Sequence, residues 1–225
     1  MIKYIIKRIP YIFPYLFTKI RKILGLIPDV SKDRKIVLSG KSISIGRYTY
    51  GYENTEILSW DENIKISIGQ FCSIACGLKL YCGGNHRTDW ISTYPFGHMY
   101  GAEMNTTPVL GTPTTNGDIC IGNDVWIGRD VTILSGIKIG DGAVIAANSH
   151  VVSNVNPYSV VGGNPSKQIK QRFSTEVIEK LLKIEWWNYP IEKIEEIVPF
   201  LCNQNEKSIS DNIKQIEVIL GINLL

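Results

Sequence analysis

Residues 119–163 read ICIGNDVWIGRDVTILSGIKIGDGAVIAANSHVVSNVNPYSVVGG, and a six-residue period runs through them. Every sixth position carries an aliphatic side chain, and the position four residues later stays small or aliphatic. The two series are Ile121, Ile127, Ile133, Ile139, Ile145, Val151 and Val125, Val131, Ile137, Ala143, Ser149, Val155. Neither the helix period nor strand alternation gives a phase of six. The pattern predicts a solenoid of short strands that turn corners around an axis.

Glycine directly follows the aliphatic residue at Gly122, Gly128 and Gly140. We expect these glycines at the corners of the coils, where the backbone takes angles that other residues cannot adopt. The same rhythm is present in residues 43–46 and again in residues 66–80. The solenoid therefore begins well before residue 119.

The step from Leu80 to Ile121 is not a multiple of six, so an insertion must leave the solenoid. We assign it to residues 84–117, which are rich in Gly, Pro, Asn and Thr. A loop of this length is unusual in a compact domain unless it is functional or disordered. Its many aromatic residues argue against disorder, and we expect it to pack over a neighbouring surface.

The expected domains are an N-terminal segment (1–33), a solenoid domain with the inserted loop (34–165) and a C-terminal helical extension (166–225). Ser174 or Thr175 is expected to cap a helix that runs through Glu185. Pro190 suits the first turn of a second helix, and a third is expected near residues 210–220. The fold class is mainly β.

Composition bounds the function classes. The chain has 225 residues, 44% hydrophobic and 20% charged, with a formal charge of +3. This charge is too small to indicate nucleic-acid binding. Five cysteines lack the CxxC spacing of a zinc site, so we expect no metal and a reducing cytoplasm. Cys72 fits the inward rhythm and is read as a core residue; the others are Cys76, Cys82, Cys120 and Cys202.

The N-terminal residues 1–28 carry six basic side chains and no acidic one. Their longest uncharged run, residues 9–18, is about half of what spans a bilayer. One interpretation is a helical cap that packs on the solenoid or on a neighbouring subunit. The other is a peripheral contact with an anionic membrane surface.

Several motifs together resemble one known family. The loop GNHRTD (84–89) leads to YPF (94–96), and DVWIG (124–128) and GGNPSKQIK (162–170) precede Trp186-Trp187. These motifs, over about residues 40–200, resemble the xenobiotic acetyltransferase branch of the hexapeptide-repeat acyltransferases. Streptogramin and related chloramphenicol acetyltransferases belong to that branch.

The resemblance implies a left-handed parallel β-helix that assembles as a homotrimer. It also implies direct acetyl transfer from acetyl-CoA to a hydroxyl or amino group, with both substrates bound together. His86 matches the general base of the family, which removes the proton of the attacking group. His150 is read as a surface residue, and His98 is left open as a packing residue of the loop.

The same resemblance implies the cofactor-binding residues. A backbone N–H near Gly128 or Trp126 is expected to stabilise the oxyanion, and Trp126 has packing at a subunit interface as its alternative. Lys167 and Lys170 are expected to meet the CoA phosphates, or else form a solvated basic patch. The pantetheine arm and the loop beside it involve Ala146, Ala147 and Pro165.

Acceptor recognition is implied for Tyr50, Asn85, Asp89 and Tyr94. Tyr50 alternates with Tyr48 and Tyr52, so the three rings are expected to share one face of a strand. Asp89 has an alternative role in pinning the loop.

Three functions compete at this point. The first is acetylation of a sugar hydroxyl or amine for surface polysaccharide or a nucleotide sugar. The second is O-acetylation of an antibiotic of the streptogramin A or chloramphenicol type. The third is a catalytically silent scaffold, against which His86 and Lys167 both argue.

Overall fold

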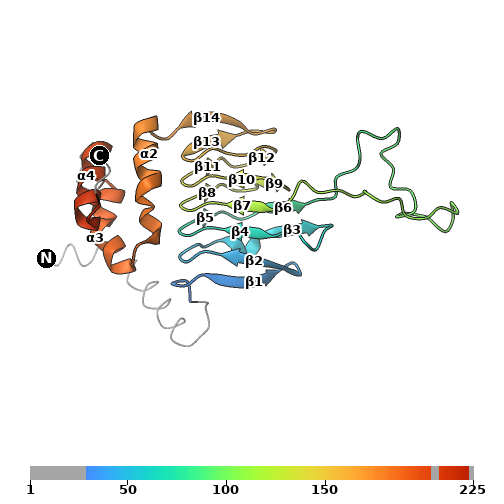
Figure 1. Ribbon diagram of the computed structural model, residues 1–225, viewed down its shortest axis with the longest axis horizontal. Helices are drawn as coiled ribbons and strands as arrows, with labels where there is room; N and C mark the ends of the chain where they lie inside the picture. Colours follow the sequence, from blue (N-terminus) through green and yellow to red (C-terminus); the bar gives the residue numbers. More distant parts are fainter. Residues whose placement is uncertain (1–28, 204–207, 223–225) are drawn as a thin grey trace, which may run out of the picture. The chain divides into compact units, whose positions relative to one another are not determined.

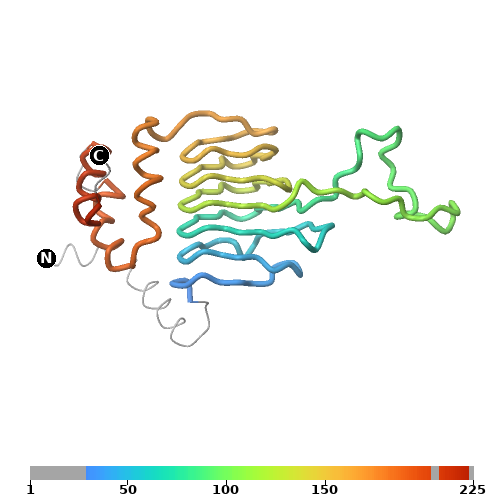
Figure 2. Tube along the Cα trace, in the orientation of Figure 1, coloured from blue at the N-terminus to red at the C-terminus, as the bar shows by residue number. Residues whose placement is uncertain are grey.

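The computed structural model describes residues 29–203 and 208–222 (Figures 1 and 2). The chain divides into two compact units, residues 1–32 and residues 33–225. Only residues 29–32 of the first unit are described, where the Asp29 carboxylate accepts hydrogen bonds from the backbone and hydroxyl of Ser31. Both interpretations of residues 1–28 therefore lie outside the described residues.

The second unit is built on three sheets whose strands stack coil upon coil (Figure 1). The first sheet contains β1 (Arg34–Leu38), β2 (Lys41–Ile45), β4 (Ile66–Ile68), β7 (Ile119–Ile121) and β10 (Lys138–Ile139). The second sheet contains β14 (Lys167–Gln171), β13 (Ser159–Gly162), β11 (Val144–Ile145), β8 (Trp126–Ile127) and β5 (Ser73–Ile74). The third sheet contains β12 (His150–Val151), β9 (Thr132–Leu134), β6 (Lys79–Cys82) and β3 (Glu56–Ser59).

The chain visits the three sheets in turn, so the expected parallel β-helix is confirmed. Both six-residue series point inward and are buried, as is Cys72. Two pairs are antiparallel and close the ends of the stack: β1 with β2, and β13 with β14. We call the turn from first to second sheet the first corner, from second to third the second corner, and from third to first the third corner.

Glycine is required at these corners for a different reason from the one expected. Gly122, Gly128 and Gly140 do not have left-handed backbone angles; Asp124 and Asp130 at the same corners do. A Cβ on Gly122 would lie 2.7 Å from Asp141 Oδ1 and 2.8 Å from its backbone nitrogen. The next coil therefore stacks so closely over the corner that no side chain fits.

The expectation for the three tyrosines was wrong. Tyr48 adopts a left-handed angle, Tyr50 forms a single bridge to Ser73, and Tyr52 begins the short 3-10 helix η1 (Tyr52–Asn54). Within these five residues the chain leaves the first corner, adds one bridged residue to the second sheet and enters the second corner, instead of running as one strand. Tyr50 is consequently exposed and Tyr52 is buried.

Helices follow the last coil, as the sequence predicted. They are α2 (Thr175–Ile184), the 3-10 helix η2 (Trp186–Asn188), α3 (Ile191–Leu201) and α4 (Ile209–Leu220). Their apolar faces form a second core together with Tyr158 and Phe71 of the β-helix. Between β6 and β7 the insertion contains no helix or strand longer than a single bridge, and it projects away from the coils (Figures 1 and 2).

Candidate active site

The insertion leaves the β-helix at the third corner, directly after β6. Its outgoing and returning segments pair at Asn85 and Thr114, which exchange backbone hydrogen bonds of 3.0 and 2.7 Å. The Thr114 hydroxyl also donates to the Asn85 carbonyl, at 3.2 Å. The bridge holds the chain immediately before His86.

The imidazole of His86 is exposed and has a defined tautomer. Its Nδ1 lies 2.7 Å from the carbonyl oxygen of Thr93. A carbonyl oxygen only accepts, so Nδ1 carries the proton and the neutral ring keeps the lone pair on Nε2. Nε2 can therefore take a proton from a hydroxyl that approaches within hydrogen-bond reach. Sequence reasoning missed Thr93, because a carbonyl role leaves no trace in residue type.

Asp89 is engaged by its neighbour in the loop. Arg87 forms two hydrogen bonds to the Asp89 carboxylate, of which the one from Nε measures 2.6 Å, and the Arg87 guanidinium lies 5.1 Å from the Trp90 ring centroid. The hydrogen bonds from Arg87 lower the pKa of Asp89 to about 2. This geometry supports the loop-pinning role of Asp89 over direct contact with an acceptor.

An open depression of about 500 Å³ lies at the base of the insertion. It is lined by Asn85, His86, Arg87, Thr88, Asp89, Thr114 and Asn116. Tyr94 instead packs on Phe96, with ring centroids 4.9 Å apart. His98 binds the carbonyl oxygen of Val109 through Nε2 at 3.0 Å, so it packs within the insertion.

The remaining predicted residues gather on the outer surface of the second sheet. Backbone register aligns Tyr50, Ser73, Trp126 and Lys170 in one outward row, through the strand pairs from β5 to β14. Tyr50 is 60% exposed and Trp126 58% exposed. An exposed aromatic pair of this kind provides apolar surface for a ligand or a neighbouring subunit.

The adjacent row, toward the second corner, carries small residues. Gly128, Ala146 and Gly162 succeed one another along the stack, and Lys167 pairs with Gly162 at its end. A Cβ on Gly128 would lie 2.6 Å from the backbone nitrogen of Ala147. The row is a shallow strip of accessible backbone that ends in exposed lysines, with the exposed Pro165 in the intervening loop.

The expected oxyanion donors are already occupied. The N–H of Trp126 donates to Ala143 O at 3.0 Å, and that of Gly128 donates to Ile145 O at 2.8 Å. These coil-to-coil bonds are part of the solenoid, so neither group is free. The N–H of Ala147, on the corner one coil above, donates no hydrogen bond within the described part of the chain.

A single chain does not bring the two groups of residues together. His86 belongs to the third corner, whereas Trp126, Gly128 and Ala146 belong to the second sheet. Among residues 29–203 and 208–222, no hydrogen bond, ion pair or ring contact joins the His86 loop to this sheet.

Other kinds of site find no support in the described residues. Within residues 29–203 and 208–222, no three His, Cys, Asp or Glu side chains gather in a group that could hold a metal ion. No helix in the same part of the chain is both long enough and apolar enough to cross a membrane. Burial raises the pKa of the Cys72 thiol to about 12, which fits a core residue.

Comparison with known proteins identifies the family. The family described as bacterial transferase hexapeptide (six repeats) matches residues 121–153. A chloramphenicol acetyltransferase of Morganella morganii is 44% identical over 177 residues, which are 73% of this chain and 84% of that protein. This chain belongs to the hexapeptide-repeat acetyltransferases. A virginiamycin A acetyltransferase of Staphylococcus aureus is 45% identical over 180 residues, 75% of this chain and 81% of the relative.

Among solved structures, a hexapeptide-repeat acetyltransferase of Vibrio cholerae complexed with acetyl-CoA is 29% identical. Its TM-score is 0.44, and the match spans 58% of this chain and 60% of that one. The family assigns the left hand to the β-helix, acetyltransferase activity to the protein and acetyl-CoA as its co-substrate. The catalytically silent scaffold is therefore excluded.

Proposed function

We propose that this hexapeptide acetyltransferase transfers an acetyl group from acetyl-CoA to a hydroxyl group of an antibiotic, with His86 as the general base. The bond from His86 Nδ1 to Thr93 carries the mechanism, because it leaves Nε2 as a proton acceptor. The acceptor class is supported by the two relatives, a chloramphenicol and a virginiamycin A acetyltransferase. Acetylation of a sugar stays a prediction that rests on the basic residues before Asp29.

The proposed reaction is a direct transfer. The acceptor hydroxyl attacks the thioester carbon while His86 Nε2 takes its proton, and a C–O bond forms. The tetrahedral intermediate then collapses, the C–S bond breaks, and the imidazolium returns the proton to the CoA thiolate. This sequence yields the acetyl ester and free CoA and needs no further co-reactant.

We assign the second-sheet residues to CoA. The small side chains of Gly128 and Ala146 let an extended pantetheine arm approach the backbone, and the free N–H of Ala147 can donate to a carbonyl of the arm or to the oxyanion. Lys167 and Lys170 lie on the edge strand β14 with exposed side chains, suited to phosphate groups.

We further propose a homotrimer in which two copies complete each active site. The support is the separation of the His86 loop from the second sheet within one chain. A loop from one copy can reach the second sheet of the next in a closed ring of identical contacts. Tyr50 and Trp126 would then lie where the two copies meet.

The test is thiol release from acetyl-CoA with chloramphenicol, virginiamycin A and a nucleotide sugar, with the product identified by mass. We expect an acetyl ester on one of the antibiotics and loss of most turnover in His86→Ala. His98→Ala is the matched control, because His98 also binds a backbone carbonyl in the insertion but lies outside the depression. Equal turnover in His86→Ala and the unmodified enzyme would remove His86 as the base.

A further inference from the structure

We propose that Trp60 is a positioning residue for His86. Its indole ring packs against the glycine hinge (Gly83 and Gly84) from which the insertion leaves the coils, and this contact fixes where the imidazole lies. This inference rests on the proposed role of His86 and extends it to a residue outside the insertion. Trp60 directly follows β3, one coil below the point where the insertion leaves β6.

The hinge consists of Gly83 and Gly84, which connect β6 to the bridge before His86. Both adopt left-handed angles, with φ of 107° and 79°. Two successive glycines would leave the insertion free to swing unless something holds them. A general base needs its position fixed to within about 0.5 Å, so the hinge has to be constrained.

Trp60 supplies that constraint by packing flat against Gly84. A Cβ on Gly84 would lie 2.7 Å from Trp60 Cε3 and 2.8 Å from Cδ2, so the glycine backbone rests on the ring itself. Tyr81 of β6 stacks on the same indole, with ring centroids 6.3 Å apart and planes inclined by 24°. The indole thus contacts the insertion at the hinge and the strand just before it.

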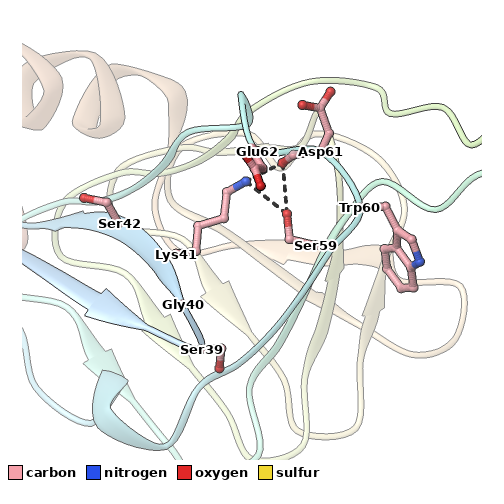
Figure 3. Close-up of a pocket in the computed structure, with 8 residues that line it drawn as sticks. All are labelled: Ser39, Gly40, Lys41, Ser42, Ser59, Trp60, Asp61 and Glu62. Atoms are coloured by element: carbon pink, nitrogen blue, oxygen red, sulfur yellow. Dashed lines mark hydrogen bonds between the residues drawn. The ribbon is translucent and has the colours of Figure 1, made fainter.

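Trp60 as a whole residue is 52% exposed, so burial alone does not hold its ring. The turn that carries it is clamped instead. Lys41 is 8% exposed, and its ammonium donates to the Ser59 hydroxyl at 3.0 Å and to the Asp61 carbonyl. The Ser59 hydroxyl also donates to Asp61 O at 3.0 Å. In Figure 3 the Lys41 amine points at this turn, whereas the Trp60 ring points away from it.

The kinetic test is Trp60→Ala in the full-length enzyme. We expect kcat to fall by about ten- to a hundredfold, because a misplacement of about 1 Å costs that much. The KM for acetyl-CoA should stay unchanged, since the second sheet is untouched. Trp60→Phe, which keeps a flat ring, should recover most of kcat. Val218→Ala, at an exposed position of α4 in the helical extension, should change neither value.

Limited trypsin digestion gives a readout independent of activity. Arg87 is the one Lys or Arg between residues 83 and 118, so cleavage after it reports directly on the insertion. We expect faster cleavage at Arg87 in Trp60→Ala and cleavage at the original rate in Trp60→Phe. Unchanged kcat in Trp60→Ala, or a lower kcat with unchanged cleavage at Arg87, would overturn the proposal.

Gly84→Ala tests the contact itself. Its added Cβ would meet the indole, so we expect it to lower kcat in the unmodified background and to cost less when Trp60 is already Ala. Strictly additive effects of Gly84→Ala and Trp60→Ala on kcat would contradict a contact between the two residues. His86→Ala separates this inference from the proposed function: full activity in that variant removes the base, whereas an inactive His86→Ala beside a fully active Trp60→Ala removes only the positioning role.

Discussion

Tyr158 is a buried residue whose hydroxyl has no hydrogen-bond partner within the described part of the chain. Its side chain is 2% exposed and packs between the last coil and the helices. Burial raises the pKa of Tyr158, and the nearby Asp124 carboxylate raises it further. An unsatisfied buried hydroxyl costs about 1–3 kcal/mol, so this position is not optimised for stability.

We predict that Tyr158→Phe stabilises the protein by about 1 kcal/mol at neutral pH, because it removes a buried polar group without changing the ring. The unfolded tyrosine ionises near pH 10, whereas the folded one stays protonated. The free energy of unfolding of the unmodified protein therefore falls as pH rises above about 10, and that of Tyr158→Phe lacks this term. The gain should therefore grow above that pH. Urea unfolding at fixed protein concentration, at neutral and alkaline pH, measures both.

Tyr52→Phe is the matched control for that measurement. Tyr52 is also buried, but its hydroxyl is not among the buried unpaired atoms, so we expect no gain in stability. A Tyr158→Phe variant that is less stable than the unmodified protein, with the same alkaline dependence, would contradict the argument.

At the scale of elements, the sequence predicted what is periodic. Strands such as β8 and β11 were expected because Ile127 and Ile145 fall in a series that only a coil of fixed length produces. Elements outside the six-residue period were harder to predict from the sequence. The antiparallel pairing of β14 was not expected, and the turn at Tyr48 was mistaken for a strand, because both depend on where a coil ends.

The candidate site divides in the same way. The motif around His86 points to the proposed base, because general-base chemistry needs that residue type, and the assignment stays a prediction. Thr93, Trp60 and Lys41 escaped notice, since each acts through backbone contacts or through segments distant in the sequence. The signal for the contact between Trp60 and the hinge was the glycine pair Gly83-Gly84 with a tryptophan one coil below. This signal can be recognised only when the register of β3 and β6 is known.

Arg47 fastens the helical extension to the β-helix. It donates to the backbone carbonyls of Trp187 and Tyr189 at 2.7 and 2.5 Å and to Gln70 Oε1 at 2.7 Å. Its guanidinium carbon also lies 5.8 Å from the ring centroid of Phe71. A planar group with several fixed donors suits this arrangement, because one side chain satisfies three acceptors, one in the β-helix and two in the helical extension.

We predict that Arg47→Ala lowers the free energy of unfolding by about 2–3 kcal/mol, because three charge-assisted hydrogen bonds are lost and two half-buried carbonyls are left unpaired. Arg47→Lys should recover only part of this, since a single ammonium cannot reproduce the fork. Thermal unfolding followed by tryptophan fluorescence, to which Trp186 and Trp187 of η2 contribute, measures the change. Equal stability of Arg47→Lys and the unmodified protein would show that charge alone suffices.

At the scale of the whole molecule, the central question is how two separated groups of residues serve one reaction. The insertion carries His86, the proposed base, away from the coils at the third corner, and the strip proposed for CoA lies on the second sheet (Figure 1). The proposed trimer, in which two copies share each site, would resolve this and would make activity depend on assembly. Each subunit then contributes to two sites, one through its loop and one through its sheet.

Subunit mixing tests that arrangement directly. His86→Ala lacks the base but keeps the sheet, whereas Ala147→Trp blocks the strip but keeps the base, so each homotrimer should be inactive. We assume that the loop of one copy meets the second sheet of the next. A site is then active only if its loop comes from the Ala147→Trp variant and its sheet from the His86→Ala variant. Unfolding and refolding an equal mixture should therefore restore about a quarter of the sites. Thiol release measures the recovered turnover, and native mass spectrometry, which resolves the small mass difference between the two variants, measures the fraction of mixed trimers. A mixture that forms mixed trimers yet stays inactive would mean that each chain completes its own site, since no intact chain is present.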